Sequence, residues 1–224
     1  MQRPIVALSC AVGLLLAGCS SNEDAEVADR TEAASQEADP SGPPARAVFL
    51  GDSYTAASDD GGGYVPAAAE GMGWTPVLAG VGSTGYVDPA PGSGPYATRV
   101  ADVVADEPDV VVVQGSTNDV GHPVADVRAA ARDLYAALGE QVPAAEVIVL
   151  GPLDPPGIDR HAVDEIRAVL SEEADAAGLT FIDPVAEDWL GSGDGLYADP
   201  VHPNEAGYAE FAAELVGALR IAGL

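Results

Sequence analysis

The stretch Ala47-Val48-Phe49-Leu50-Gly51-Asp52-Ser53-Tyr54-Thr55 carries the first clear signal of the fold. Its apolar residues 47–50 predict a short buried strand, and the small and polar residues after them predict a turn that opens a helix. A serine at such a turn presents its hydroxyl at the carboxyl edge of a sheet, where open α/β sheets bind ligands. Its backbone N–H lies at a helix N-terminus, where it can stabilise a negatively charged oxygen. Ser53 is therefore a candidate nucleophile, although Gly, Asp and Ser are also ordinary turn and cap residues.

Short apolar runs alternate with helical patterns over residues 46–224. The runs that predict buried strands are residues 47–50, 76–79, 110–113, 147–150 and 179–182. The segments that predict helices, with apolar residues three or four positions apart, are residues 64–70, 96–105, 124–138, 159–177 and 204–219. Strands that are apolar throughout and alternate with helices indicate a parallel sheet with both faces covered. We therefore expect an α/β fold, a three-layer α/β/α sandwich formed by a single domain.

The composition excludes several classes of function. The 224 residues include nine arginines, no lysine and 36 acidic residues, and the formal net charge of −27 disfavours nucleic-acid binding. The only cysteines, Cys10 and Cys19, precede the predicted domain, which therefore has no disulfide, thiolate nucleophile or cysteine metal site. The three histidines are scattered and show no metal-ligand spacing. We expect neither a metal nor another cofactor.

The N-terminus has the pattern of a secretory signal. Arg3 precedes an apolar stretch, residues 5–16, that is too short to span a bilayer as a mature helix but suits a signal-peptide core. The sequence Leu-Ala-Gly-Cys at residues 16–19 closes this stretch and resembles the lipobox of bacterial lipoproteins. That resemblance implies cleavage after Gly18 and a diacylated Cys19. The alternative is an ordinary secretory signal with a chance cysteine.

The residues between Cys19 and the domain contain almost nothing to bury. Residues 20–45 are mostly Ser, Asn, Glu, Asp, Ala, Thr and Gln and end in a Pro-rich run, which predicts a disordered acidic tether. Two acyl chains on Cys19 would give stable attachment without a spanning helix. We therefore expect residues 1–18 to be a lipoprotein signal peptide and residues 19–45 a lipidated tether. The domain, residues 46–224, would lie outside the cytoplasm, anchored by lipid to a bacterial cell membrane.

A second polar segment follows the predicted strand 110–113, so it lies at the same sheet edge as Ser53. It reads Gln-Gly-Ser-Thr-Asn-Asp at residues 114–119. The Asn118 amide is a neutral hydrogen-bond donor that can point at an oxyanion without quenching a nucleophile. Taken alone, this segment can also be an ordinary loop.

A candidate base lies just before the last predicted helix, in Asp199-Pro200-Val201-His202. An aspartate three residues before a histidine can turn back onto the imidazole Nδ1 and leave Nε2 free as a base toward a serine. The alternative is a surface histidine between turn and cap residues. His122 and His161 are the other candidate bases, of which His122 lies beside the Asn118 segment and His161 lacks a nearby orienting motif.

A glycine-rich loop, residues 78–86, follows the second predicted strand at the same edge. Its glycines allow backbone N–H groups to turn inward and a substrate to approach closely. Such a loop is weak evidence alone, and its neighbours are what point to a functional role.

These four segments, in this order and at strand ends, resemble the SGNH or GDSL hydrolase family over residues 46–224. The resemblance implies a flavodoxin-like fold with Ser53 as nucleophile, His202 as general base and Asp199 as the carboxylate that orients it. It also implies an oxyanion hole. Its donors would be the N–H of Ser53, a backbone N–H at Gly82 or Ser83, and the side-chain amide of Asn118.

Two positions depart from the family pattern. Leu78 stands where the second segment often begins with an asparagine, which leaves both Gly82 and Ser83 open as the donor. Tyr54 stands in place of the leucine that commonly follows the serine, so we expect different packing behind the nucleophile.

The family resemblance implies a serine esterase that works through an acyl-serine intermediate. The loop at residues 151–157 is short, so we expect a shallow cleft suited to small acyl groups such as acetyl, carried by a small molecule or a glycan. Trp74, Tyr86 and Trp189 are candidate substrate platforms, although core or rim packing is the stronger prediction for each. A catalytically inactive, surface-anchored carbohydrate- or ligand-binding lipoprotein with the same fold is the alternative. Peptide hydrolysis is a third and weaker alternative. We expect the protein to be a monomer.

Overall fold

Five parallel strands form one sheet in the order β2-β1-β3-β4-β5. The strands are β1 (Arg46–Gly51), β2 (Thr75–Gly80), β3 (Val110–Gln114), β4 (Glu146–Leu150) and β5 (Thr180–Ile182). The computed structural model describes residues 43–59, 62–191 and 195–224. Each strand lies within one or two residues of its prediction from apolar runs. The strand order is that of flavodoxin-like folds, which confirms the predicted α/β class.

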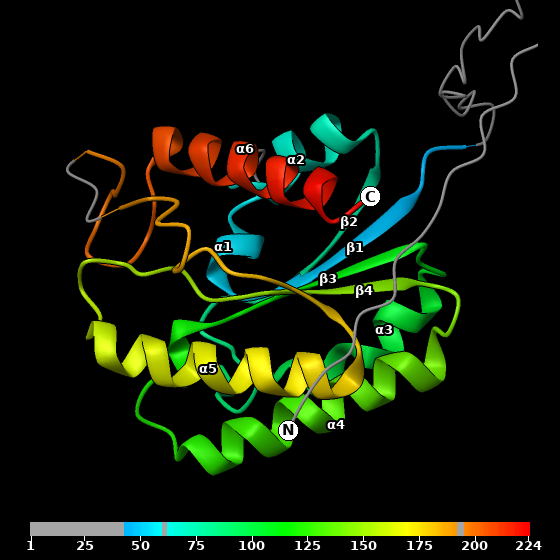
Figure 1. Cartoon of the computed structure of the whole chain (residues 1–224), viewed down its shortest axis with the longest axis horizontal. Helices are drawn as coiled ribbons and strands as arrows, with labels where there is room; N and C mark the ends of the chain where they lie inside the picture. The colour runs from blue at the N-terminus through cyan, green and yellow to red at the C-terminus, as the bar shows by residue number, and fades with distance from the viewer. Residues whose placement is uncertain (1–42, 60–61, 192–194) are drawn as a thin grey trace, which may run out of the picture. The chain divides into compact units, whose positions relative to one another are not determined.

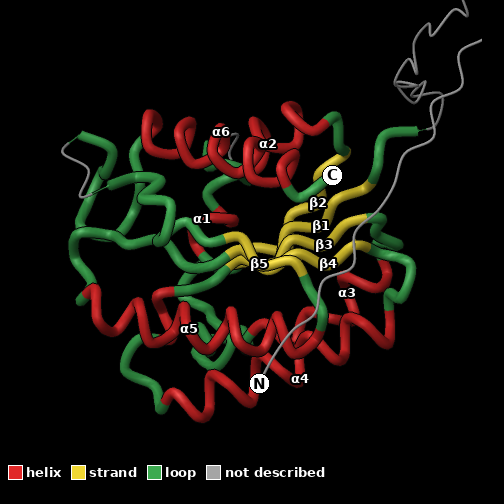
Figure 2. The backbone as a smooth tube through the Cα atoms, in the orientation of Figure 1, coloured by secondary structure: helices red, strands yellow, loops and turns green. Residues whose placement is uncertain are grey.

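Helices cover both faces of this sheet (Figures 1 and 2). One face is covered by α2 (Val65–Met72) and α6 (Glu205–Ile221), and the other by α3 (Val100–Ala105), α4 (Val124–Gln141) and α5 (Arg160–Ala177). The helix predicted over residues 96–105 divides into a 3₁₀ turn, η1 (Tyr96–Arg99), followed by α3. The apolar spacing correctly predicted helical structure in this segment, but such spacing cannot distinguish a 3₁₀ turn from an α-helix.

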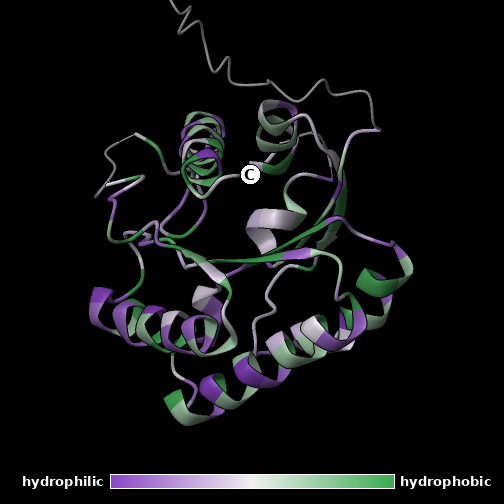
Figure 3. Cartoon of the chain, turned by 45° about the vertical axis from the view of Figure 1, so that its right-hand side comes forward, coloured by the Kyte–Doolittle hydropathy of each residue, from purple (hydrophilic) through white to green (hydrophobic). Residues whose placement is uncertain are grey.

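The strands are apolar throughout because they feed two cores. In β3, Val111 and Val113 belong to the core under α4 and α5, whereas Val110 and Val112 belong to the core under α2 and α6. Alternate strand residues point to opposite faces, so a strand covered on both sides must be apolar at every position. Figure 3 shows the strands mainly green and the helices alternating between green and purple.

The carboxyl ends of the strands gather the loops that carry the candidate site. In the strand register Gly51 pairs with Gly80, and Gln114 pairs with Leu150. The loops after β1, β2, β3 and β4 therefore leave the sheet along one edge. The chain turns to opposite sides at β1 and β3, which is the point where open α/β sheets form ligand sites.

The predicted signal peptide, Cys19 and most of the tether lie outside the described residues and stay predictions. Among the helices that the structure describes, none is long and apolar enough to cross a membrane.

Candidate active site

Ser53 is the first residue of the short helix α1 (Ser53–Ala56), directly after β1. The Asp52 carboxylate caps this helix by accepting the N–H of Tyr54 at 2.9 Å. The Ser53 side chain is half-buried, and its Oγ lies 3.0 Å from Nε2 of His202. The predicted nucleophile and base are thus brought together from positions 149 residues apart.

Asp199 folds back onto His202, as the spacing predicted. Its Oδ2 lies 2.9 Å from Nδ1 of the imidazole, and its Oδ1 accepts the N–H groups of Val201 and His202, each at 2.7 Å. These hydrogen bonds to the charged form, the backbone ones first, lower the pKa of the Asp199 carboxyl to about 2. An ionised Asp199 holds the proton on Nδ1, so Nε2 presents its lone pair to Ser53.

Three backbone carbonyls of the segment Asp199–His202 are tied to other parts of the chain. The Tyr54 hydroxyl donates to the carbonyl of Val201 at 2.7 Å, the N–H of Gly157 donates to that of Pro200 at 2.6 Å, and the N–H of Ala198 donates to that of His202 at 2.8 Å. Tyr54 is almost fully buried, and its ring meets the imidazole edge to face at 5.8 Å. Tyr54 therefore links the nucleophile helix to the base. The departure from the family's leucine was the only sign of this role in the sequence.

A buried polar network lies beneath Ser53. Asp52 is 2 % exposed and accepts the side-chain amide of Gln114 and the hydroxyl of Ser116, each at 2.8 Å. Burial raises the pKa of the Asp52 carboxyl, and the hydrogen bonds from Tyr54, Ser116 and Gln114 oppose that rise. No role was predicted for Asp52, Gln114 or Ser116. Their common position after buried strands was the only available signal.

The predicted oxyanion donors come from the segments after β1, β2 and β3, whereas His202 lies just before α6. The Asn118 amide sits in the 3₁₀ turn η2 (Thr117–Asp119) and donates to the carbonyl of Thr84 at 3.0 Å. Its second contact, to Asp52 at 3.5 Å, is long, so one amide hydrogen remains available. Gly82 lies beside Ser53, since a Cβ added there would stand 3.9 Å from the serine Cβ.

Gly82 and Ser83 differ as candidate donors. Ser83 is exposed and has a φ of 57°, in the left-handed region that a serine seldom adopts. In the part of the chain that the structure describes, the N–H groups of Ser53, Gly82 and Ser83 all lack a protein acceptor, so what distinguishes Gly82 is its place beside Ser53. The geometry therefore favours Gly82, while the donor role of either residue stays a prediction.

The remaining sequence candidates lie away from this arrangement. His161 is 85 % exposed on α5, and His122 faces Asp88 at 3.5 Å. Tyr86 and Trp189 are buried in the two cores, which confirms packing as their role. Within residues 43–59, 62–191 and 195–224, no three His, Cys, Asp or Glu side chains gather closely enough to hold a metal ion.

Comparisons with known proteins agree with this geometry. Residues 49–210 match the model of the GDSL-like lipase/acylhydrolase family. The chain is 32 % identical to a GDSL lipase of Mycobacterium tuberculosis in an alignment 185 residues long that covers 77 % of this chain and 80 % of that protein.

Solved structures show the same fold at lower identity. A catalytic mutant of an acetylxylan esterase from Geobacillus stearothermophilus matches with a TM-score of 0.62 and 20 % identity, covering 79 % of this chain and 95 % of that chain. A lipase/acylhydrolase from Enterococcus faecalis matches with a TM-score of 0.60 and 22 % identity, covering 77 % and 96 %. The family match, the relative and the fold lead to one conclusion: the chain belongs to the GDSL-like lipase/acylhydrolase family and is a serine ester hydrolase.

Proposed function

We propose that the protein cleaves esters of small acyl groups through an acyl-Ser53 intermediate. The observation that carries this proposal is the continuous hydrogen-bonded line from Ser53 Oγ to His202 Nε2, at 3.0 Å, and from His202 Nδ1 to Asp199 Oδ2, at 2.9 Å. A hydroxyl in this line can lose its proton to the imidazole as it attacks a carbonyl.

The reaction proceeds in two halves. Ser53 Oγ attacks the ester carbonyl while its proton passes to His202 Nε2, and that proton then goes to the leaving alcohol as the C–O bond breaks. Water next gives a proton to the same nitrogen and attacks the acyl-serine, and the proton returns to Ser53 Oγ as the acid leaves. Asp199 stabilises the imidazolium that exists between these transfers.

In each half of the reaction the carbonyl oxygen of the ester becomes negatively charged. We place this oxygen on the side of Ser53 away from His202. We assign its donors as the N–H of Ser53, the N–H of Gly82 and the amide of Asn118. Gly82 lies beside Ser53, the Asn118 amide reaches the neighbouring Asp52 at 3.5 Å, and among the described residues the two N–H groups have no protein acceptor. Donors fixed in place before the reaction are worth more than donors that must turn toward the charge.

We also propose that the alcohol part of the substrate is bulkier than its acyl part. Because His202 must protonate the leaving oxygen, the alcohol part of the substrate lies on the imidazole side of Ser53. We assign the alcohol to a cavity of about 510 Å³ whose wall includes Pro203, the residue after His202, together with Tyr208 and Ala57, a volume in the range of small-ligand sites. An acetylated glycan fits this division, and the acetylxylan esterase with the same fold is consistent with it.

We further propose that the enzyme works at the outer face of a bacterial cell membrane, anchored through Cys19. The support is the Leu-Ala-Gly-Cys sequence and the acidic segment after it. Radiolabelled fatty acid should enter the wild-type protein and not the Cys19→Ala variant. Equal incorporation would remove the anchor from the proposal and leave the catalytic part intact.

Hydrolysis of p-nitrophenyl acetate tests the catalytic proposal. Ser53→Ala and His202→Ala should each lower kcat by about 10⁴-fold or more, whereas His161→Ala, which changes an exposed histidine of α5, should match the wild type. A p-nitrophenyl ester series should favour acetate over octanoate. A folded wild type that neither hydrolyses these esters nor reacts with a fluorophosphonate would favour the alternative, an inactive ligand-binding lipoprotein.

A further inference from the structure

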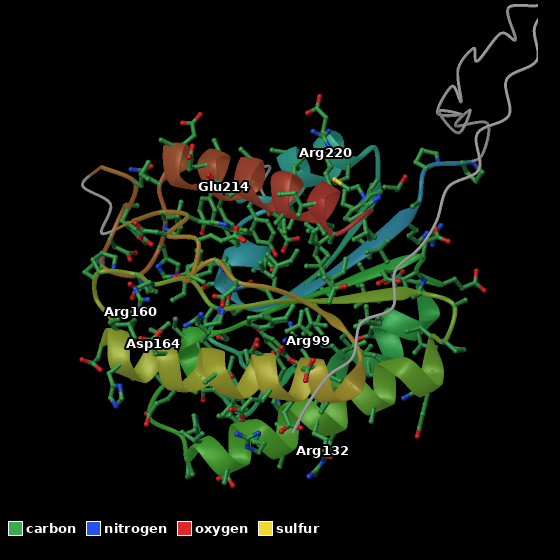
Figure 4. The ribbon with its side chains drawn as sticks, in the orientation of Figure 1. Arg99, Arg132, Arg160, Asp164, Glu214 and Arg220 are labelled. Atoms are coloured by element: carbon green, nitrogen blue, oxygen red, sulfur yellow. The ribbon has the colours of Figure 1, made fainter. Side chains whose placement is uncertain are left out.

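Arg99 differs in its position from four other arginines, which form ion pairs at the surface: Arg128, Arg132, Arg160 and Arg167. It ends η1 and lies between the sheet and the helices below it, whereas Arg132 extends outward from α4 (Figure 4). Its guanidinium carbon stands 4.9 Å from the centre of the Tyr96 ring. Within the described residues no carboxylate pairs with it. A half-buried cation without a carboxylate is costly, so its contacts need an explanation.

The guanidinium of Arg99 joins the carboxyl ends of β1 and β2 to the glycine-rich loop that runs from β2 to η1. Nη1 donates to the carbonyls of Gly51 at 2.9 Å and Ala79 at 2.7 Å, and Nη2 donates to the hydroxyl of Thr84 at 3.0 Å. Gly51 is two residues before Ser53, and Thr84 is two residues after Gly82. One rigid, planar group therefore spans the nucleophile and the glycine-rich loop, which a lysine could not do with its single nitrogen.

Thr84 passes this constraint to the other oxyanion donor. It is fully buried, and its hydroxyl, besides accepting from Arg99, donates to the carbonyl of Val81 at 2.7 Å. Its own carbonyl accepts the Ser116 hydroxyl and the Asn118 amide, each at 3.0 Å. Ser83, between Gly82 and Thr84, keeps its left-handed φ of 57°, a conformation that persists only where the surroundings hold it.

We propose that Arg99 is a positioning residue of the oxyanion hole, acting through Thr84 on the Gly82 N–H and the Asn118 amide. This inference rests on the proposed function, because it needs the oxyanion to lie at those donors. Arg99 touches neither substrate nor reacting atoms. Its effect falls on the transition state, where the oxygen is charged, and hardly on the bound ester, where it is neutral.

The test compares Arg99→Met and Arg99→Lys with Arg132→Met in the purified full chain. With p-nitrophenyl acetate, Arg99→Met should lower kcat by about 10- to 100-fold with little change in KM, since one displaced oxyanion donor costs up to about 10²–10³-fold. Arg99→Lys should lie between Arg99→Met and the wild type, and Arg132→Met should equal the wild type. The inhibition constant of phenylboronic acid, whose serine adduct is tetrahedral and negatively charged, should rise by the same factor as kcat/KM falls.

Two results would overturn the proposal. One is a wild-type kcat and wild-type boronate affinity in Arg99→Lys or Arg99→Met, whatever the melting temperature, because Arg99 would then serve stability alone. The other is a rise in KM that accounts for the whole loss. Should Arg99→Met fail to fold, Arg99→Lys decides by the same criteria. Retained activity in Ser53→Ala would instead overturn the proposed function, so the two failures are distinguishable.

A nearly isosteric change at Thr84 tests the route. Thr84→Val removes the hydroxyl that receives Arg99 and should lower kcat by a smaller factor than Arg99→Met. In the double variant Arg99→Met/Thr84→Val, the two losses should not multiply, because both remove the same link. Fully multiplicative losses would show that Arg99 acts by another route and would overturn the proposal as stated.

Discussion

The two sides of Ser53 are built in contrasting ways. On the oxyanion side, Thr84 and Ser116 have no exposed surface and Asp52 has 2 %, and the Ser116 hydroxyl lies within hydrogen-bond distance of both the Asp52 carboxylate and the backbone carbonyl of Thr84. On the base side, the side chains of His202 and Asp199 are 41 % and 51 % exposed. The base side combines hydrogen bonds within residues 198–202 with two contacts from distant positions, Tyr54 and Gly157, whereas the oxyanion side joins three loops that are distant in sequence.

This difference matches what each side must do in the reaction. Oxyanion donors contribute most when they are fixed before the charge appears, so a buried network suits them. The imidazole must exchange protons with an alcohol and with water, and water must reach the acyl-serine, so an open position suits it. We infer that substitutions on the oxyanion side act through the geometry of the donors, and that those around His202 act through the orientation of the imidazole.

Apart from the loss of Ser53 or His202 themselves, the largest expected effect is at Asn118. Asn118→Ala should lower kcat by about 10²–10³-fold with KM nearly unchanged, because it removes one oxyanion donor. Asn118→Asp keeps the shape of the side chain but replaces the donor by a negative charge, so its loss should be at least as large. Steady-state kinetics with p-nitrophenyl acetate measures both. Near-normal turnover in Asn118→Ala would remove this residue from the oxyanion hole.

A smaller effect is expected where the two sides meet, at Tyr54. Tyr54→Phe removes only the hydroxyl that binds the carbonyl of Val201. One neutral hydrogen bond contributes about 1 kcal/mol, so kcat should fall by up to about tenfold as the loop of His202 loosens. Kinetics and thermal unfolding of the same samples give the two readouts.

Tyr64→Phe is the matched control for Tyr54→Phe. Its hydroxyl lies 3.0 Å from that of Thr55, a residue of α1, and among the described residues it makes no hydrogen bond to the base loop. It should lower the melting temperature by a similar amount and leave kcat unchanged. Equal kcat in both variants would show that the Tyr54 hydroxyl stabilises the fold without positioning His202.

The sequence was sufficient for features that depend on local patterns. The five strands follow from apolar runs, and the contact between Asp199 and His202 follows from a three-residue spacing. The proximity of Ser53 and Asn118 follows from a topological rule, since both come after parallel strands. The fold class and the outline of the candidate site could therefore be predicted before any coordinates.

The contacts that hold the site could not be predicted in this way. Tyr54 reaches a carbonyl 147 positions away, and Arg99 reaches one 48 positions away. Both bind backbone oxygens, which every residue has, so no side-chain pattern marks the partner. Arg99 also lies in a segment whose spacing indicated only a helix, and its direction depends on how η1 meets the sheet.

The smallest expected effect is on the pH dependence of stability, in which the carboxylates of the two sides, Asp199 and Asp52, should differ. Asp199 has a pKa of about 2, below its ordinary 3.8, because of the backbone N–H groups and the imidazole that it accepts. Its stabilising contribution is therefore complete above pH 3.8 and is lost as the pH falls toward 2. Melting temperatures of the wild type and Asp199→Asn between pH 6 and pH 2 should converge as the pH falls.

Asp52 should behave in the opposite way, because burial raises its pKa above 3.8. The folded protein then binds a proton before the unfolded chain does, so the wild type gains stability relative to Asp52→Asn as the pH falls through the raised pKa toward 3.8. The melting-temperature difference between these two proteins should shift in favour of the wild type over that interval, while the difference for Asp199→Asn narrows below it. If the two melting-temperature differences changed in parallel with pH, burial would not distinguish the two carboxylates. The contrast between a desolvated oxyanion side and a solvated base side would then rest on geometry alone.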